Sequence, residues 1–135
     1  EFIFEYPMVD RNPLAKWTKG RVTLLGDAAH PMYPRGSNGA GQAILDAVDL
    51  AKRLASKVGH GEALELYEHE RRPKTTEVVH ANRTMPPDAI LKEVYERTGD
   101  KPFDEIADII EREELELIAN KYKTVAGFDL TSLET

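Results

Sequence analysis

Apolar residues recur at three- and four-residue spacing between residues 39 and 57, and this period predicts a helix with one apolar side. The recurring positions are Ala40, Ala43, Ile44, Ala47, Leu50, Ala51 and Leu54. Small residues dominate its first turns, so the helix can approach a sheet or a flat ligand closely. We expect Asp46 and Asp49 to face away from the apolar side, where they are solvated or cap the helix. The glycines at 59 and 61 predict its end.

Two shorter apolar runs precede this helix and predict β-strands. Residues 2–6 are aromatic and β-branched, and Pro7 ends the run. Residues 22–25 form a second run, which stops at Gly26 and Asp27. The order strand, turn, helix predicts a mostly helical α/β fold. Asp27 then lies at the end of a strand, where open sheets of this class bind ligands.

The second half of the chain predicts further helices. A long helix from Glu62 towards Arg83 is expected to kink or break at Pro73, because proline lacks the backbone N–H and clashes with the preceding turn. The run at 85–87 contains two prolines and marks a boundary. Beyond it, apolar residues at helical spacing among carboxylates predict an acidic amphipathic helix within 100–117, either solvated or docked on a partner.

Composition changes this picture little but excludes several classes of function. The chain has 135 residues, a formal charge of −6 and 31% charged residues, which argues against a nucleic-acid surface. No run is long enough for a membrane-spanning helix, and there is no secretory signal. The absence of cysteine excludes disulfides and thiolate ligands, and agrees with the cytoplasmic location that we expect. The four histidines fit no zinc spacing, so no metal site is predicted.

Candidate chemistry lies in the glycine-rich segment between the second predicted strand and the first helix. Gly26 allows close approach where the strand stops, and Asp27 supplies a carboxylate there. The glycines of residues 36–41 leave backbone N–H groups at the start of the helix without intrahelical acceptors. Such a helix end favours an anion by about 0.3–2 kcal/mol. Each element alone is more often a plain turn or a packed helix, but their joint spacing favours a site for a polar, partly anionic cofactor.

The block from Pro7 to Leu54 resembles the second FAD-binding motif of the single-component aromatic-ring hydroxylases. These are flavoprotein monooxygenases such as the p-hydroxybenzoate and salicylate hydroxylases. The Gly-Asp-Ala-Ala-His run at 26–30 carries the resemblance, while the lead-in at 7–11 and the loop at 34–43 are most similar to the phenazine-hydroxylase branch. The resemblance implies the C-terminal part of a p-hydroxybenzoate-hydroxylase-like FAD-binding fold.

The resemblance also implies which residues bind the cofactor. In the family, the aspartate of this motif binds a ribityl hydroxyl of FAD, and backbone amides of the following loop and helix hold the pyrimidine edge of the flavin. The cofactor-binding candidates are Gly26, Asp27, Gly39, Ala40 and Gly41, with Gln42 as a further possibility. His30 is expected to orient the turn by hydrogen bonding.

Two further residues are implied as parts of a substrate loop. Pro34 and Arg35 occupy the place where the loop of the family passes between flavin and substrate. Arg35 either faces an anionic aromatic substrate or lies in solvent. The resemblance assigns no catalytic residue.

The implied activity is aromatic hydroxylation. In the family, NAD(P)H reduces FAD, reduced FAD captures O2, and the resulting flavin 4a-hydroperoxide oxygenates a small aromatic substrate. FAD-dependent epoxidases and non-oxygenating oxidoreductases carry the same motif and stay open as alternatives. We expect Arg71 and Arg72 to pair with Glu68 and Glu70 or with acids on the missing part of the protein, with binding of the NAD(P)H phosphates as the other possibility.

The first FAD motif of the family, a Gly-x-Gly-x-x-Gly turn that holds the pyrophosphate, does not occur in these 135 residues. We therefore expect a carboxy-terminal fragment that is inactive alone and needs the N-terminal part of the same protein as its partner. Its expected parts are a strand of the substrate domain (1–6), the second half of the FAD-binding domain (7–83) and a helical extension (84–135). The unpaired strand and apolar helix side also predict a non-catalytic, self-associating homo-oligomer as an alternative.

Overall fold

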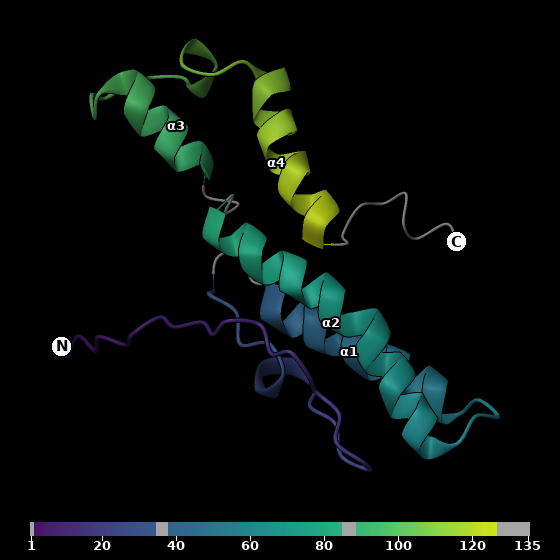
Figure 1. Ribbon diagram of the computed structural model, residues 1–135. Helices are drawn as coiled ribbons and strands as arrows, with labels where there is room; N and C mark the ends of the chain where they lie inside the picture. Colours follow the sequence, from purple (N-terminus) through teal and green to yellow (C-terminus); the bar gives the residue numbers. More distant parts are fainter. Residues whose placement is uncertain (1, 35–37, 85–88, 127–135) are drawn as a thin grey trace. The chain divides into compact units, whose positions relative to one another are not determined.

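The computed structural model describes residues 2–34, 38–84 and 89–126 (Figure 1). The elements are η1 (Gly26–Ala28), α1 (Asn38–Leu54), α2 (His60–Thr84), α3 (Ala89–Thr98), η3 (Ile106–Asp108) and α4 (Arg112–Ala126), where η marks a 3-10 turn. The chain divides into two compact units, Glu1–His80 and Ala81–Thr135.

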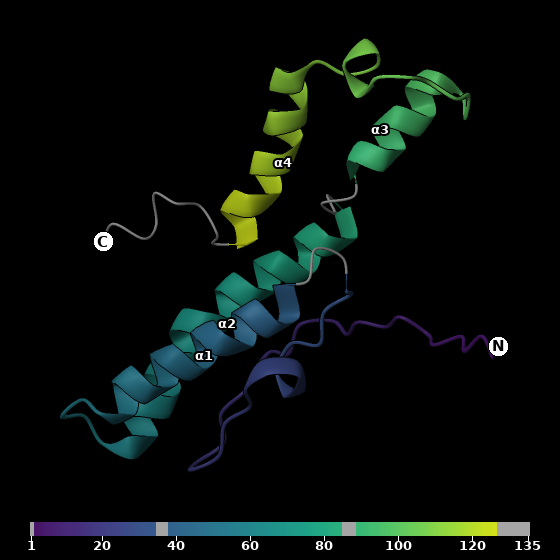
Figure 2. The same ribbon diagram turned by 180° about the vertical axis from the view of Figure 1, so that it is seen from behind.

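The first unit is built on two long helices. Figures 1 and 2 show α1 and the first part of α2 side by side, with η1 and the segment just before it next to the pair, whereas the N-terminal end extends away from it. Trp17, Ala29 and Tyr67 form the buried core, and the rings of Trp17 and Tyr67 lie 5.8 Å apart between centroids. Leu14, Leu24 and Leu50 pack around them. The core therefore joins the segment before η1 to both helices.

The strands predicted at 2–6 and 22–25 are absent from the described part of the chain. A strand is stabilised by a ladder to a neighbour, and the one pairing described is an isolated bridge between Lys19 and Val22 around a tight turn. Without such a ladder these apolar side chains stay in solvent: Ile3 is 97% exposed and Val22 is 67% exposed. The α part of the α/β prediction is thus seen directly, and the β part is not.

Helix α1 confirms the predicted helix, but its fully buried residues are not those of the predicted apolar side. Its buried residues are the polar Asn38, Gln42 and Asp46, which follow one another at four-residue spacing. Ile44 and Ala47, on the predicted apolar side, are exposed. The prediction that Asp46 is solvated or caps the helix is wrong, because this residue is fully buried against partners that only the fold brings near.

Helix α2 continues through Pro73, so the predicted break does not occur. Side-chain hydrogen bonds lie next to the proline on the same helix. The hydroxyl of Thr75 donates to the carbonyls of Arg71 and Arg72, at 3.2 Å each. Buried side chains lie on both sides of the proline, with Tyr67 before it and Val78 after it.

The turn between α1 and α2 also differs from the prediction. α1 ends at Leu54, where the hydroxyl of Ser56 donates to the carbonyl of Arg53 at 2.6 Å. Gly59 starts the next helix instead of ending the previous one, because its carbonyl accepts the N–H of Ala63 at 2.9 Å.

The second unit holds α3, η3 and α4. The acidic helix predicted within 100–117 is wrong: Gly99 and Asp100 adopt positive φ angles of 60° and 62°, which end α3, and α4 begins only at Arg112. Arg97 joins the two helices by pairing with Glu114. The same guanidinium donates to the carbonyl of Ile109 at 3.3 Å. The predicted boundary at 85–87 lies outside the described residues.

Candidate cofactor-binding site

The site begins at η1, the short turn that follows the extended segment. Gly26 has φ +59°, and the backbone N–H groups of Ala29 and His30 both donate to its carbonyl at 2.9 Å. A side chain at this position would also meet the helix, because a Cβ on Gly26 would lie 3.2 Å from the Cβ of Ala43. The role of Gly26 is therefore to form the turn, because both its backbone conformation and its packing against α1 require a glycine.

Asp27 is exposed and makes no hydrogen bond or ion pair to any described residue. Its carboxylate lies beside the start of α1, since a Cβ placed on Gly39 would be 3.8 Å from Oδ1 of Asp27. Both oxygens of Asp27 are thus available as acceptors for hydroxyl groups of a ligand.

The start of α1 supplies the complementary donors. Gly39, Ala40 and Gly41 occupy its first turn, where backbone N–H groups have no acceptor within the helix. The absence of side chains at the two glycines leaves the backbone open to close approach. A carboxylate that accepts and amides that donate therefore lie next to each other. This pairing fits a ligand that carries both hydroxyl groups and an electron-rich carbonyl edge, as the ribityl chain and pyrimidine ring of FAD do.

Of the two predicted substrate-loop residues, the structure describes Pro34 alone. Pro34 is exposed, and Arg35 lies outside the described residues. Their role next to a substrate stays a prediction.

A buried polar cluster lies directly behind the turn. Oδ2 of Asp46 accepts from Nε2 of His30 at 2.6 Å and from the backbone N–H of Gly26 at 3.2 Å. Oδ1 accepts from Nε of Arg71 at 2.8 Å, and Nη2 of Arg71 donates to Oε1 of Gln42 at 2.6 Å. The hydrogen bond by which His30 was expected to orient the turn is therefore present, and its acceptor is Asp46.

Burial sets the charge state of this cluster. Burial raises the pKa of Asp46, but the hydrogen bonds from His30 and Arg71 together lower it by more than burial raises it. The pKa of Asp46 is therefore below its ordinary value, and the carboxylate is ionised. Burial, together with the nearby negative charge of Asp46, raises the pKa of the Tyr67 hydroxyl. This hydroxyl is neutral and donates to the carbonyl of Leu24 at 3.1 Å.

Sequence reasoning missed this cluster, and it paired one of the two arginines incorrectly. Arg72 does meet Glu68, at 3.4 Å, whereas Arg71 turns to Asp46. A signal was present in the sequence: Asn38, Gln42 and Asp46 recur at four-residue spacing and so form a polar row along one side of the helix. The apolar row on the same helix has more members, and the prediction of the buried side followed that row instead.

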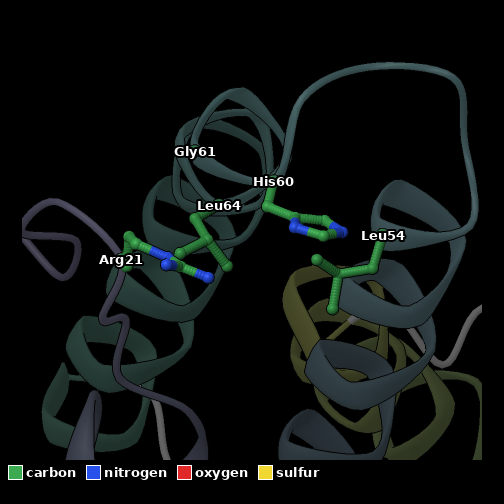
Figure 3. Close-up of a pocket in the computed structure, with 5 residues that line it drawn as sticks. All are labelled: Arg21, Leu54, His60, Gly61 and Leu64. Carbon is green, nitrogen blue, oxygen red and sulfur yellow. The ribbon is translucent and has the colours of Figure 1, made fainter.

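The first unit also contains a cavity of about 310 Å³ at the far end of α1 (Figure 3). Arg21 reaches it from the extended segment, Leu54 from the end of α1, and His60, Gly61 and Leu64 from the start of α2. The backbone candidates Gly39, Ala40 and Gly41 lie in the first turn of the same 17-residue helix, roughly 20 Å from Leu54 at 1.5 Å per residue. This cavity is therefore separate from the cofactor-binding candidates.

Two other classes of site were sought within 2–34, 38–84 and 89–126. These residues contain no group of three or more histidine, cysteine or carboxylate side chains that could hold a metal ion. No helix in the same ranges has both the length and the apolar character to cross a bilayer.

The Asp27 carboxylate and the start of α1 fit an FAD-binding protein. The sequence profile of the FAD binding domain family matches residues 7–82, more than half of the chain, and the chain belongs to this family. The resemblance inferred from the motif is thereby confirmed.

Individual relatives are aromatic-ring oxygenases by name. The chain is 64% identical over 81 residues to phenazine 1,6-dicarboxylic acid hydroxylase PhzS of Lysobacter antibioticus, covering 60% of this chain and 20% of the relative. It is 40% identical over 79 residues to 6-hydroxynicotinate 3-monooxygenase of Bordetella bronchiseptica (56% and 20%) and 46% identical over 77 residues to 3-hydroxybenzoate 6-hydroxylase of Klebsiella oxytoca (56% and 19%). The chain thus spans about a fifth of the length of these relatives.

Proposed function

We propose that this chain is the part of an FAD-dependent aromatic-ring monooxygenase that holds the ribityl chain and pyrimidine edge of the flavin. The observation that supports this most directly is the exposed, unpartnered carboxylate of Asp27 beside the first turn of α1. It lies within the residues that match the FAD binding domain family.

Each group has a distinct role in this proposal. Asp27 accepts a hydrogen bond from a ribityl hydroxyl, and the backbone N–H groups of Gly39, Ala40 and Gly41 donate to the carbonyl edge of the ring. When bound, FAD would supply the redox chemistry, with NAD(P)H as the reductant and O2 as the oxidant. The amides at the start of α1 favour the negative charge that reduction places on the flavin, because their dipoles are already aimed at it.

The proposed substrate is a small aromatic compound that carries a carboxylate. The names of three relatives contain such a ring: phenazine 1,6-dicarboxylic acid, 6-hydroxynicotinate and 3-hydroxybenzoate. The α/β fold of p-hydroxybenzoate hydroxylase and a partner segment that contributes the pyrophosphate-binding turn belong to the same proposal. NAD(P)H is the proposed co-substrate.

Flavin retention tests the proposal. The chain is incubated with FAD and desalted, and its visible absorption spectrum is recorded next to that of a full-length hydroxylase that carries this chain. We expect a stoichiometric flavin band in the full-length protein and little or none in the 135-residue chain, because the chain lacks a pyrophosphate-binding turn. A full-length protein that stays colourless at saturating FAD would refute the proposed function.

Self-association without catalysis is a second candidate, and the exposed apolar side of α1 favours it. Ile44 is 65% exposed and Val48 is 45% exposed on adjacent turns. A patch of this kind marks a contact surface more often than a free one. Gel filtration across the micromolar range tests this candidate: an elution volume that falls with concentration supports it, and a constant monomer volume rejects it.

A further inference from the structure

We propose that Asp46 is the positioning residue of the flavin site. Its carboxylate fixes the turn formed by Gly26 and Asp27 against the start of α1, and Arg71 holds that carboxylate in place. This inference rests on the proposed function, because it describes how the chain presents Asp27 to FAD.

The geometry of the carboxylate is the first step. Both oxygens of Asp46 are engaged: Oδ2 accepts from the N–H of Gly26 and from His30, and Oδ1 accepts from Arg71. The partners lie 20, 16 and 25 residues away in the sequence. Asp46 is therefore the point at which η1, α1 and α2 meet, and the residue after its backbone partner is Asp27.

Burial and charge are the second step. The Asp46 side chain is 0% exposed, and the side chains of His30 and Arg71 are 3% and 8% exposed. Removing two charges from water costs free energy, which their mutual attraction offsets only with good geometry. Here the guanidinium is also anchored on Oε1 of Gln42, one turn earlier on the same helix. The ion pair is thus held rigidly along the buried side of α1.

The link to the site is the third step. Gly26 lies close to Ala43, because a Cβ added to Gly26 would be 3.2 Å from the Cβ of Ala43. The N–H of Gly26 donates to Oδ2 of Asp46. If this peptide rotated, the following Asp27 would leave its place beside Gly39. The structure therefore assigns to Asp46 the task of fixing the peptide orientation that keeps the Asp27 carboxylate at the helix start.

The experiment compares Asp46→Asn with Asp49→Asn in the 135-residue chain. Asp49 lies on the same helix and pairs with Arg53 at 3.2 Å, but its side chain is 21% exposed, so it controls for loss of a charge on α1. Amide hydrogen exchange is measured by NMR at a temperature where both variants are folded. We expect the Gly26 amide of Asp46→Asn to exchange about tenfold faster relative to the Val78 amide in α2, because one hydrogen bond is lost locally. Asp49→Asn is expected to match the unsubstituted chain.

The ratio to Val78 separates positioning from stability. If Asp46 only stabilised the core, both amides would exchange faster by the same factor, and that result would overturn the proposal. Arg71→Lys is the milder variant, because lysine keeps the charge but cannot contact Asp46 and Gln42 with one planar group. A smaller selective increase at Gly26 is expected there. Should Asp46→Asn fail to fold, an unchanged Gly26 ratio in folded Arg71→Lys would also overturn the proposal.

Flavin binding gives an independent readout. In a full-length hydroxylase that carries this chain, we expect Asp46→Asn to raise the Kd for FAD by about tenfold or more, and Asp49→Asn to leave it unchanged. Equal FAD affinity in both variants would refute the link to Asp27. If the unsubstituted protein binds no FAD, the proposed function fails. The exchange of Gly26 then still decides whether Asp46 fixes the turn.

Discussion

Gly26→Ala is the sharpest single test of the turn that carries the site. The substitution adds one methyl group at a position with φ +59°, where the new Cβ would lie 3.2 Å from the Cβ of Ala43. Two separate costs follow. A left-handed backbone conformation costs an L-residue roughly 1–2 kcal/mol, and an extra carbon forced into a packed contact costs about 1–3 kcal/mol. We therefore expect the free energy of unfolding to fall by roughly 2–5 kcal/mol.

The chain contains a matched control for each cost. Gly20 has nearly the same backbone angle, φ +60°, but a Cβ there would meet nothing within 4 Å. Gly20→Ala should therefore show the backbone cost alone. Ala43→Gly removes the opposing methyl group, so the double substitution should recover the packing cost in a double-mutant cycle.

Fluorescence of Trp17 during urea unfolding is a suitable assay. Trp17 is the one tryptophan in the sequence, and it is buried in the core next to Tyr67. Its emission therefore reports unfolding of the unit that contains the site. If Gly26→Ala were no more destabilising than Gly20→Ala, or if Ala43→Gly recovered nothing, the close packing of the turn on α1 would be wrong.

Three further predictions concern the same unit. Asp27→Ala in a full-length hydroxylase that carries this chain should lower the FAD content of the purified protein, and an unchanged flavin absorbance would contradict its role. Tyr67→Phe removes the hydrogen bond to the carbonyl of Leu24 and should cost about 0.5–1.5 kcal/mol in urea unfolding, whereas Tyr95→Phe at a 60% exposed position should cost nothing measurable. Because the pKa of Asp46 is lowered in the folded chain, its ionised form stabilises the fold above the ordinary value of 3.8, and this contribution is lost as the pH falls further. Asp46→Asn should therefore weaken the loss of stability in acid that urea titrations from pH 6 to pH 3 measure on the unsubstituted chain.

The sequence predicted local elements well wherever local periodicity decided them. The helix predicted at 39–57 is α1, and the one from Glu62 to Arg83 is α2, within a few residues at each end. The predicted turn at Gly26 also appears in the structure, because a glycine directly after an apolar run is itself a local turn signal.

Predictions that depended on distant partners failed, and for a physical reason. A run such as 22–25 becomes a strand only if another strand pairs with it, which the run itself does not encode. Asp46 is buried because Arg71 and His30 arrive from elsewhere in the chain, at sequence separations of 25 and 16. Hydrophobic periodicity treats a carboxylate as solvated, so it assigns the wrong side of a helix whenever a carboxylate is matched by buried donors.

The polar row on α1 has a consequence for how this helix finds its orientation. An apolar row can pack against many surfaces with little preference, but Asp46 buried without Arg71 and His30 would leave an uncompensated charge. The side of α1 that faces the core is therefore determined mainly by the pairing of Asp46 with Arg71 and His30. Exposed residues of α1 such as Ile44 and Val48 do not contribute to this orientation. Substitution at these positions should therefore leave the orientation of the helix start unchanged.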